Sequence, residues 1–393
     1  MRRPPENLQP VRDVAASARV PELEGLRALL AWTVVAVHIL ISCGWFGPTS
    51  NGTPVLAQVA VGAVDLFMLL SGFAITRLIV VQCEPFHHYL WRRACRIVPA
   101  YWVALAAAVA LNGLLIRNLG HLPATPERDG SLAICQLAEA RMWIDLPLHL
   151  SLLHGLIPAK VLPFEPFTFL GAAWSLSLEW QFYCVAPLAV FVALRSWIGA
   201  AIVLALAAIT LLLAGKTLAM FSEAFLPVKA AFFVVGGLSY FAMADVRSSR
   251  LAAVLLIAPV TILALAWWAV SGRSIEAVIA GSGWVVITAA VHFRKFDWLR
   301  NLLNSDPMQF LGRVSYSTYL FHAPVLVVVQ AAIWHWLHPG GFWQLLAATT
   351  VVGTIGTLIV SALSWHFIER PFQQIGRGAT GEKRRDSRRS DHQ

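Results

Sequence analysis

The sequence predicts an all-α protein, a polytopic transmembrane helical bundle with about ten spans. Hydrophobic residues make up 58% of the 393 residues, charged residues make up only 13%, and the mean hydropathy is +0.66. A soluble domain of this length needs far more charge on its surface. The apolar residues also gather in stretches of about 20 residues, the length that an α-helix needs to cross the hydrocarbon core of a bilayer.

These stretches set the order of the expected helices, and their Lys and Arg content sets the expected orientation. An even number of spans places both termini on one side, and most Lys and Arg residues then fall on that side, which the positive-inside rule assigns to the cytoplasm. The expected spans are 26–44, 59–81, 98–116, 172–194, 197–215, 228–244, 251–270, 275–292, 314–337 and 342–366.

The membrane domain is expected to occupy residues 23–372, between two polar tails. Residues 1–22 and 373–393 show no periodic apolar pattern, so we expect both to be flexible and cytoplasmic. The longest connection, 117–171, contains several prolines and two moderately apolar stretches. We expect it to form a cap over a cavity on the outer face.

The formal net charge of +9 does not indicate a nucleic-acid partner. The excess lies in short loops and in a basic C-terminal tail, where it sets topology and attracts the anionic lipids of the bilayer. The cysteines and the paired histidines lack the spacing of a metal site, so no metal is expected.

Two ionisable residues share one face of the first span. Arg27 and His38 are separated by about three helical turns, or about 16 Å along the axis. An ionisable group at membrane depth usually faces a bundle interior or a water-filled cavity. The alternative is that Arg27 reaches the lipid headgroups while His38 is a hydrogen-bonded packing residue.

The second span and the segment after it carry further charged residues. Asp65 and Gly72 share one helical face, and a carboxylate in that position requires a partner. Arg93 and Arg96, three residues apart, face the same way if their segment is helical. Paired guanidinium groups suit phosphate, although basic residues also serve as ordinary anchors at cytoplasmic helix ends.

The fourth span begins with a polar stripe. Ser175, Glu179 and Tyr183 recur every four residues, which is not the pattern of a lipid-facing surface. Counting residues from the outer ends of the spans places His38, Asp65 and Glu179 in one layer. A histidine with carboxylates in a dry cavity suits general acid–base chemistry, and the alternative is a structural ion-pair network.

The ninth span contains Tyr316, His322 and Pro324. The same counting places His322 nearer the cytoplasmic side than His38, so we expect it to be structural or to line a cavity. Pro324 is expected to permit a kink that frees backbone carbonyls.

The ordered set of motifs resembles the acyltransferase-3 family of integral membrane acyltransferases. The resemblance covers residues 23–372, approximately. It rests on six short motifs, or blocks, whose order along the chain is more specific than any one of them. The six blocks are Arg27 to His38, Asp-Leu-Phe to Ser-Gly-Phe (Asp65–Phe73), Arg-x-x-Arg with Ile-x-Pro-x-Tyr (Arg93–Tyr101), Trp-Ser-Leu-x-x-Glu-x-x-Phe-Tyr (Trp174–Tyr183), Leu-Gly-x-x-Ser-Tyr-x-x-Tyr-Leu-x-His (Leu311–His322) and Glu-Arg-Pro-Phe (Glu369–Phe372).

The resemblance implies a bacterial inner-membrane O-acyltransferase. Such an enzyme moves an acyl group, most often acetyl from acetyl-CoA, onto a hydroxyl of a cell-surface or exported glycan or glycolipid. Carried over by position, His38 is the candidate catalytic base, Arg27 its companion, and Arg93 and Arg96 the candidate contacts to the phosphates of acyl-CoA. Glu179 and Asp65, at the same expected depth as His38, are further candidate catalytic residues, as carboxylates that orient the imidazole. Candidate substrate-binding residues are Trp174, Ser175, Tyr183, Tyr316 and His322.

Two other classes of protein share some of these features. A transporter or flippase for a lipid-linked saccharide or an acidic small molecule also uses intramembrane His, Arg and Asp. It should neither bind acyl-CoA nor cleave its thioester, and the sequence shows no internal repeat of the transporter kind. A structural scaffold in a glycan-synthesis complex predicts that replacing His38 is harmless.

Overall fold

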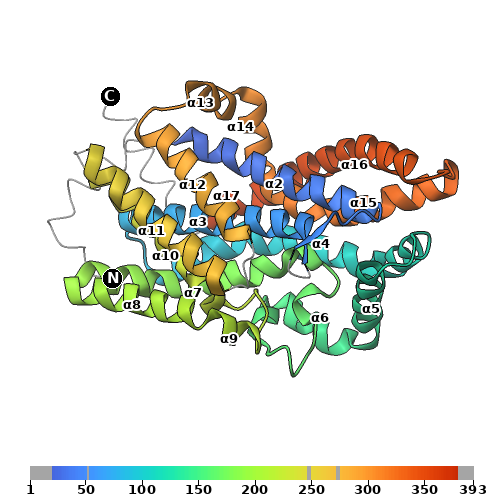
Figure 1. Ribbon diagram of the computed structural model, residues 1–393, viewed down its shortest axis with the longest axis horizontal. Helices are drawn as coiled ribbons and strands as arrows, with labels where there is room; N and C mark the ends of the chain where they lie inside the picture. Colours follow the sequence, from blue (N-terminus) through green and yellow to red (C-terminus); the bar gives the residue numbers. More distant parts are fainter. Residues whose placement is uncertain (1–19, 51–52, 246–248, 271–274, 379–393) are drawn as a thin grey trace.

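The computed structural model describes residues 20–50, 53–245, 249–270 and 275–378 (Figure 1). Each of the ten expected spans falls on a helix, and most of the long helices run side by side along the molecule (Figure 1). The long helices are α2 (Pro21–Ser42), α3 (Val55–Gln82), α4 (Phe86–Gly120), α7 (Trp174–Arg195), α8 (Trp197–Leu212), α10 (Leu226–Asp245), α11 (Ser249–Val270), α12 (Glu276–His292), α15 (Ser315–Trp336) and α16 (Phe342–Ser364).

Shorter elements connect these helices. They are α5 (Pro126–Ala140), α6 (Met142–Leu150), α9 (Ala214–Leu218), α13 (Asp297–Leu303), α14 (Asp306–Arg313) and α17 (Arg370–Gly378), with 3-10 turns η2 (His154–Leu156), η3 (Glu165–Phe167) and η4 (Gly171–Ala173) and a π-helical turn η5 (Trp365–Glu369). Two-residue strands β1 (Thr49–Ser50) and β2 (Thr53–Pro54) pair antiparallel, with Thr49 opposite Pro54.

The all-α polytopic bundle predicted from the sequence is confirmed. Within the described residues, seven helices are long and apolar enough to cross a membrane, or eight if α12 and α13, bent by 94°, count as one span. The apolar helix α8 has 16 residues and is about 24 Å long, which is less than the hydrocarbon thickness of about 30 Å. A count of ten spans therefore stays a prediction.

Helix ends differ in detail from the expected boundaries. The helix α2 already begins at Pro21, and α17 continues to Gly378, beyond the expected boundary at residue 372. The remainder of the two expected tails, 1–19 and 379–393, lies outside the described residues. The helix α15 runs through Pro324 without interruption.

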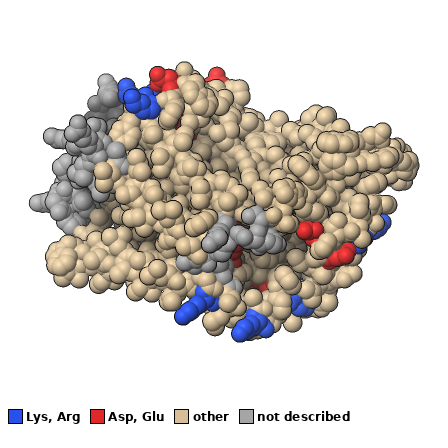
Figure 2. All heavy atoms as spheres, viewed as in Figure 1, with Lys and Arg blue, Asp and Glu red and all other residues tan. Residues whose placement is uncertain are grey.

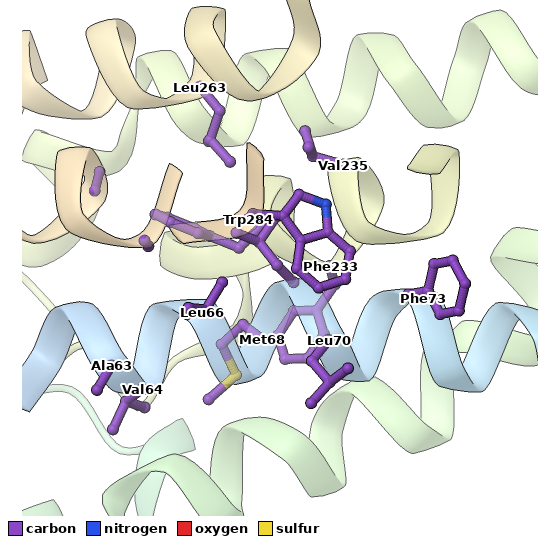
Figure 3. Packing of buried hydrophobic residues seen from close by; sticks show 14 of the residues in the cluster. Ala63, Val64, Leu66, Met68, Leu70, Phe73, Phe233, Val235, Leu263 and Trp284 are labelled. Atoms are coloured by element: carbon purple, nitrogen blue, oxygen red, sulfur yellow. The ribbon is translucent and has the colours of Figure 1, made fainter. Parts of the chain in front are cut away.

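The core is organised around α3, which packs against α2, α7, α10 and α12. Glycines bring the backbones of α3 and α10 together, because a Cβ on Gly72 would collide with the Phe233 carbonyl and a Cβ on Gly236 with the Leu69 carbonyl. Phe73 of α3 makes edge-on contact with Trp284 of α12 at a ring-centre distance of 6.1 Å. Figure 3 shows this apolar packing between α3 and the neighbouring helices.

The outer surface of the bundle is largely apolar. The face in Figure 2 shows few charged side chains, most of them near the upper edge and in the lower part of the view, and residues of other kinds cover most of the rest. Large apolar side chains are strongly exposed on several helices, among them Leu188 on α7, Trp197 and Leu212 on α8 and Ile262 on α11. A surface of this kind is stable against lipid chains rather than water.

The long connection between α4 and α7 has a buried polar interior. Four ionisable side chains in this connection are fully buried, and we call them the cap cluster: Asp145, His149, His154 and Glu165. The rings of His149 and His154 stack with centres 4.3 Å apart, and His149 Nε2 lies 2.9 Å from the Thr168 hydroxyl. The chain from η2 to η4 is therefore folded into the protein before α7 begins.

Candidate active site

A pocket of about 610 Å³, including its open mouth, lies among five helices. It is bounded by α2, α3, α4, α7 and α15, at the end of the bundle where α2 and α15 begin. Its polar lining consists of Arg27, Ser71, Arg96, Ser175, Glu179, Ser315, Tyr316 and Tyr319. The structure thus brings together five of the residues singled out from the sequence.

The pocket uses one face of α3 and leaves the other to the core. Val64, Met68 and Ser71 line the pocket at helical spacing. Asp65 and Gly72 lie on a different face, about 100° around the helix, against α10, as their shared spacing predicted. Asp65 is therefore turned away from the pocket.

Glu179 accepts hydrogen bonds from two side chains at the wall of this pocket. The Tyr183 hydroxyl donates to Glu179 Oε1, and the Ser71 hydroxyl donates to the same oxygen at 3.3 Å. The Arg93 guanidinium lies over the Tyr183 ring, 5.9 Å from its centre. Glu179 is thus held in place by neighbours from α3 and α7.

The two arginines of α4 are on the same side of the helix, as their spacing predicted. Arg96 lines the pocket, and its charge interacts with the carboxylates of Glu369 and Glu179. Glu369, in the π-helical turn, also accepts a hydrogen bond from Ser317 at 3.1 Å. Arg93 stands behind the wall, against Tyr183, and does not line the pocket.

The aromatic residues of α15 join three helices around the pocket. The Tyr316 hydroxyl donates to the Ile97 carbonyl at 2.6 Å. The Tyr319 hydroxyl donates to the Ala172 carbonyl and lies 2.8 Å from the Ser175 hydroxyl. Trp174, expected to bind substrate, is instead buried in the core beside the pocket.

Glu179 does not share a layer with His38, which differs from the depth prediction. It lines the pocket together with Arg27, about 16 Å along α2 from His38. The reason is that α7 begins inside the bundle, where the Ser177 hydroxyl donates to the Leu152 carbonyl and accepts from the Gly155 N–H. Counting from residue 172 as an outer surface therefore places Glu179 too close to that surface.

His38 meets His322 beyond the pocket. Their ring centres are 4.9 Å apart, with the planes inclined by 65°. The two rings lie at one level, whereas the sequence placed His322 nearer the cytoplasmic side. The Gln330 side chain donates to the carbonyl of Ser42, the last residue of α2, so α15 extends past the end of α2 and counting from both outer ends misaligns the helices.

The tautomer of the neutral His38 ring follows from its hydrogen bond. Its Nδ1 lies 2.8 Å from the Val34 carbonyl, which can only accept a hydrogen bond. Nδ1 therefore carries the proton in the neutral ring, and Nε2 offers a lone pair. His38 is only partly buried, whereas His322 is fully buried.

Tyr319 lies between the pocket and the two histidines. It lines the pocket, and its ring centre is 6.2 Å from that of His322. Tyr319 therefore links the wall of the pocket to the histidine pair.

Asp65 has a partner that the sequence analysis missed. Lys229 of α10 is fully buried and lies 2.9 Å from Asp65 Oδ1, with Glu223 Oε2 at 3.7 Å and Glu276 Oε1 at 3.9 Å. The Lys229 ammonium also lies over the Trp267 ring, 4.2 Å from its centre. We call Lys229, Asp65, Glu223 and Glu276 the lysine cluster. A single lysine within the apolar stretch 228–244 was the signal for it.

The described residues thus form a helical bundle with a cation-lined pocket and a neutral imidazole pair, an arrangement equipped for binding an anionic ligand and for proton transfer. They contain no group of three or more His, Cys, Asp or Glu residues that could hold a metal. A family model described as an acyltransferase domain matches residues 20–366, and the protein belongs to this family.

Curated relatives agree with this family. Among them are YrhL of Bacillus subtilis (strain 168), named as a candidate peptidoglycan O-acetyltransferase, at 25% identity over 91% of this chain and 55% of the relative, and the peptidoglycan O-acetyltransferase OatA of Listeria monocytogenes, at 23% over 91% and 56%. The chain thus spans about half the length of these two proteins. Nodulation protein 10 of Rhizobium leguminosarum bv. viciae is 26% identical over 86% of this chain and 91% of the relative. No solved structure matches the protein.

Proposed function

We propose that the protein transfers an acetyl group from acetyl-CoA to a hydroxyl of a cell-surface or exported glycan or glycolipid. The observation that carries this proposal is one helix face: Arg27 lines the pocket, and His38 lies about 16 Å further along α2 beside a second imidazole. The names of the relatives, two of which refer to peptidoglycan O-acetylation, support the choice of an acetyl group and a glycan.

The arginines of the pocket suit the phosphates of the donor. Arg27 and Arg96 both line the pocket, and a guanidinium group binds phosphate through charge-assisted hydrogen bonds. Arg93, behind Tyr183, adds positive charge without lining the pocket. With its phosphates at Arg96, the donor extends its acyl-bearing arm past Tyr319 toward His38.

The chemistry at His38 is acyl transfer with general base catalysis. The acceptor oxygen attacks the thioester carbonyl while His38 Nε2 takes the hydroxyl proton. The carbon–sulfur bond then breaks, and the proton on His38 passes to the departing thiolate, which leaves as the thiol of CoA. Glu179 and Arg27 hold the donor side of the pocket, and the Val34 carbonyl keeps the His38 ring oriented.

The proposed setting is the bacterial inner membrane. Donor enters from the cytoplasm at the end where α2 and α15 begin, and acceptor reaches His38 from the other side. In this arrangement residues 23–372 act as one membrane domain, and both termini are cytoplasmic.

Purified protein in lipid nanodiscs tests the function directly. With acetyl-CoA labelled in the acetyl group and a peptidoglycan fragment as acceptor, wild-type protein should produce a labelled ester and free CoA in equal amounts. A His38→Ala variant with normal abundance should produce neither, yet should bind CoA. Failure of the wild-type protein to bind CoA or to cleave its thioester would favour a transporter over an enzyme.

A further inference from the structure

His322 carries a second imidazole ring, and its Nε2 atom has no hydrogen-bond partner among the described residues. Its Nδ1 lies 2.8 Å from the Tyr319 carbonyl and 3.3 Å from the Thr318 carbonyl, both of which only accept hydrogen bonds. Nδ1 therefore carries a proton, and full burial disfavours a second proton on the ring, so the imidazole is neutral. The Nε2 lone pair is fully buried, and no group among the described residues forms a hydrogen bond with it.

An unpartnered buried acceptor in a native protein calls for a donor that the bare chain does not supply. The centres of the His38 and His322 rings are 4.9 Å apart. A group that donates a hydrogen bond to His322 is therefore close to the group that reacts at His38. Nε2 of His38 and Nε2 of His322 can each accept a hydrogen bond. A ligand that matches both atoms therefore offers two hydrogen-bond donors. A phosphate or a carboxylate offers none, which separates this place from the arginine-lined pocket.

We propose that His322 is a positioning residue that binds a second hydroxyl of the acceptor, while His38 takes the proton of the reacting hydroxyl. This inference rests on the proposed function and narrows the acceptor to a sugar unit with two hydroxyls within reach of the paired rings. His38, the partly exposed ring, meets the reacting hydroxyl first. The second hydroxyl lies deeper, toward the buried His322.

The choice of histidine at both positions follows from charge. His38 becomes an imidazolium when it takes the proton, and a Lys or Arg beside it would oppose that charge. A neutral His322 accepts a hydrogen bond and adds no charge of its own. The carbonyls of Thr318 and Tyr319 hold it in the tautomer that accepts at Nε2.

A cycle of protein variants and acceptor analogues tests this role. The probes are the methyl β-glycoside of N-acetylglucosamine and its 3-, 4- and 6-deoxy analogues, with acetyl-CoA as donor. One analogue lacks the reacting hydroxyl and is no substrate. Of the other two, one should lose about five- to a hundredfold in kcat/KM with wild-type protein, as expected for a buried acceptor left unpaired.

His322→Phe keeps a ring but cannot accept the hydrogen bond. In this variant the same analogue and the parent glycoside should have equal kcat/KM. His322→Gln, whose amide oxygen can accept it, should restore part of the difference. The KM for acetyl-CoA should stay unchanged in both variants. His335→Phe, an exposed histidine on the same helix, is the matched control and should behave as wild type.

Equal sensitivity of wild type and His322→Phe to every analogue would reduce His322 to a packing residue. A second readout does not depend on how the variants fold: the ¹⁵N resonance of His322 Nε2 in histidine-labelled wild-type protein should move when the glycoside is added without donor. A resonance that stays in place at saturating glycoside would also overturn the proposal. Failure of wild-type protein to acylate any glycoside would instead count against the proposed function, before any variant is compared.

Discussion

Two polar regions lie on different faces of α3 and differ in how their charges are satisfied. On one face, Ser71 reaches Glu179 at the wall of an open pocket, which Arg27 and Arg96 also line. On the other face, Asp65 is sealed against Lys229 with neither side chain exposed. One helix of the bundle therefore separates a region that can receive a ligand from one that is closed by its own ion pairs.

The difference shows what burial of charge does in a membrane bundle. A buried lysine remains charged only where carboxylates compensate it, and the lysine cluster supplies three. Such a cluster specifies how α3, α10 and α12 fit together. Around the pocket, in contrast, Arg27 and Arg96 line an open volume, and beyond the pocket His322 Nε2 has no hydrogen-bond partner among the described residues. We therefore expect variants of the lysine cluster to change stability, and variants of the pocket and the histidine pair to change ligand binding or reaction rate.

The largest effect is expected for His38→Gln. The amide can still form a hydrogen bond but cannot take the proton of a hydroxyl, so acyl transfer should fall by about 10²- to 10⁴-fold. Thermal unfolding in nanodiscs should stay close to that of wild type. The variant His335→Gln, at an exposed site on α15, is the control for loss of a histidine as such. Near-normal transfer by His38→Gln would return His38 to a packing role.

Lys229→Met should lose stability rather than rate per folded molecule. Removal of the ammonium leaves Asp65 buried without its partner, which should cost about 3–5 kcal/mol in the free energy of unfolding. Equilibrium unfolding in mixed micelles measures this loss, and the double variant with Asp65→Asn should recover part of it. Lys216→Met, at an exposed lysine of α9, is the matched control. Equal free energies of unfolding for Lys229→Met and Lys216→Met would contradict a structural role for the lysine cluster.

Arg96→Ala should weaken donor binding. Loss of one charge-assisted phosphate contact should cost about 1.5–3 kcal/mol, or about ten- to a hundredfold in the Kd of acetyl-CoA. Arg93→Ala should have a smaller effect, because that side chain lies over Tyr183 and not on the pocket lining. Arg92→Ala, one turn earlier and paired with Glu84, is the control. Binding is measured by calorimetry with CoA, and unchanged affinity in Arg96→Ala would assign this arginine to anchoring.

The smallest effect concerns pH and the cap cluster. Burial is the main cause that raises the pKa of Glu165 to about 8, helped by the nearby Asp145 and opposed by Arg141. Burial also lowers the pKa of His149 to about 4. The folded protein therefore holds the Glu165 proton between its ordinary pKa of 4.5 and about 8, so this contribution to stability is lost as pH rises.

His149 acts in the opposite direction, because its lowered pKa removes stability as pH falls from 6.5 toward 4. The two slopes oppose each other up to about pH 6.5. Between pH 6.5 and 8, wild-type stability should fall by at most about 1.4 kcal/mol per pH unit, and Glu165→Gln should remove that slope. Unfolding temperatures across this range provide the measurement, with Glu139→Gln, at an exposed carboxyl in the same connection, as control. An identical slope in Glu165→Gln would assign the loss to other groups.

Much of the fold followed from the sequence by itself, because the features concerned depend on one helix at a time. Apolar length predicted where the long helices lie, and helical pitch predicted that Arg27 and His38 share a face and that Asp65 shares one with Gly72. The motif order pointed to the acyltransferase family, which the match over residues 20–366 confirms. The statements about helices and their faces need only residues that are near one another along the chain, whereas the family follows from the order of six short motifs.

Only the tertiary structure decided which residues meet across helices. Asp65 is partnered by Lys229, far along the chain, and no periodicity within either helix could join the two. His322 reaches His38 because α15 extends past the end of α2, and Glu179 lies at the level of Arg27 because the chain before α7 folds into the bundle. Spacing along one helix fixes angles and rises within that helix. Relative heights of helices depend on connections and side-chain packing between them, which no local pattern encodes.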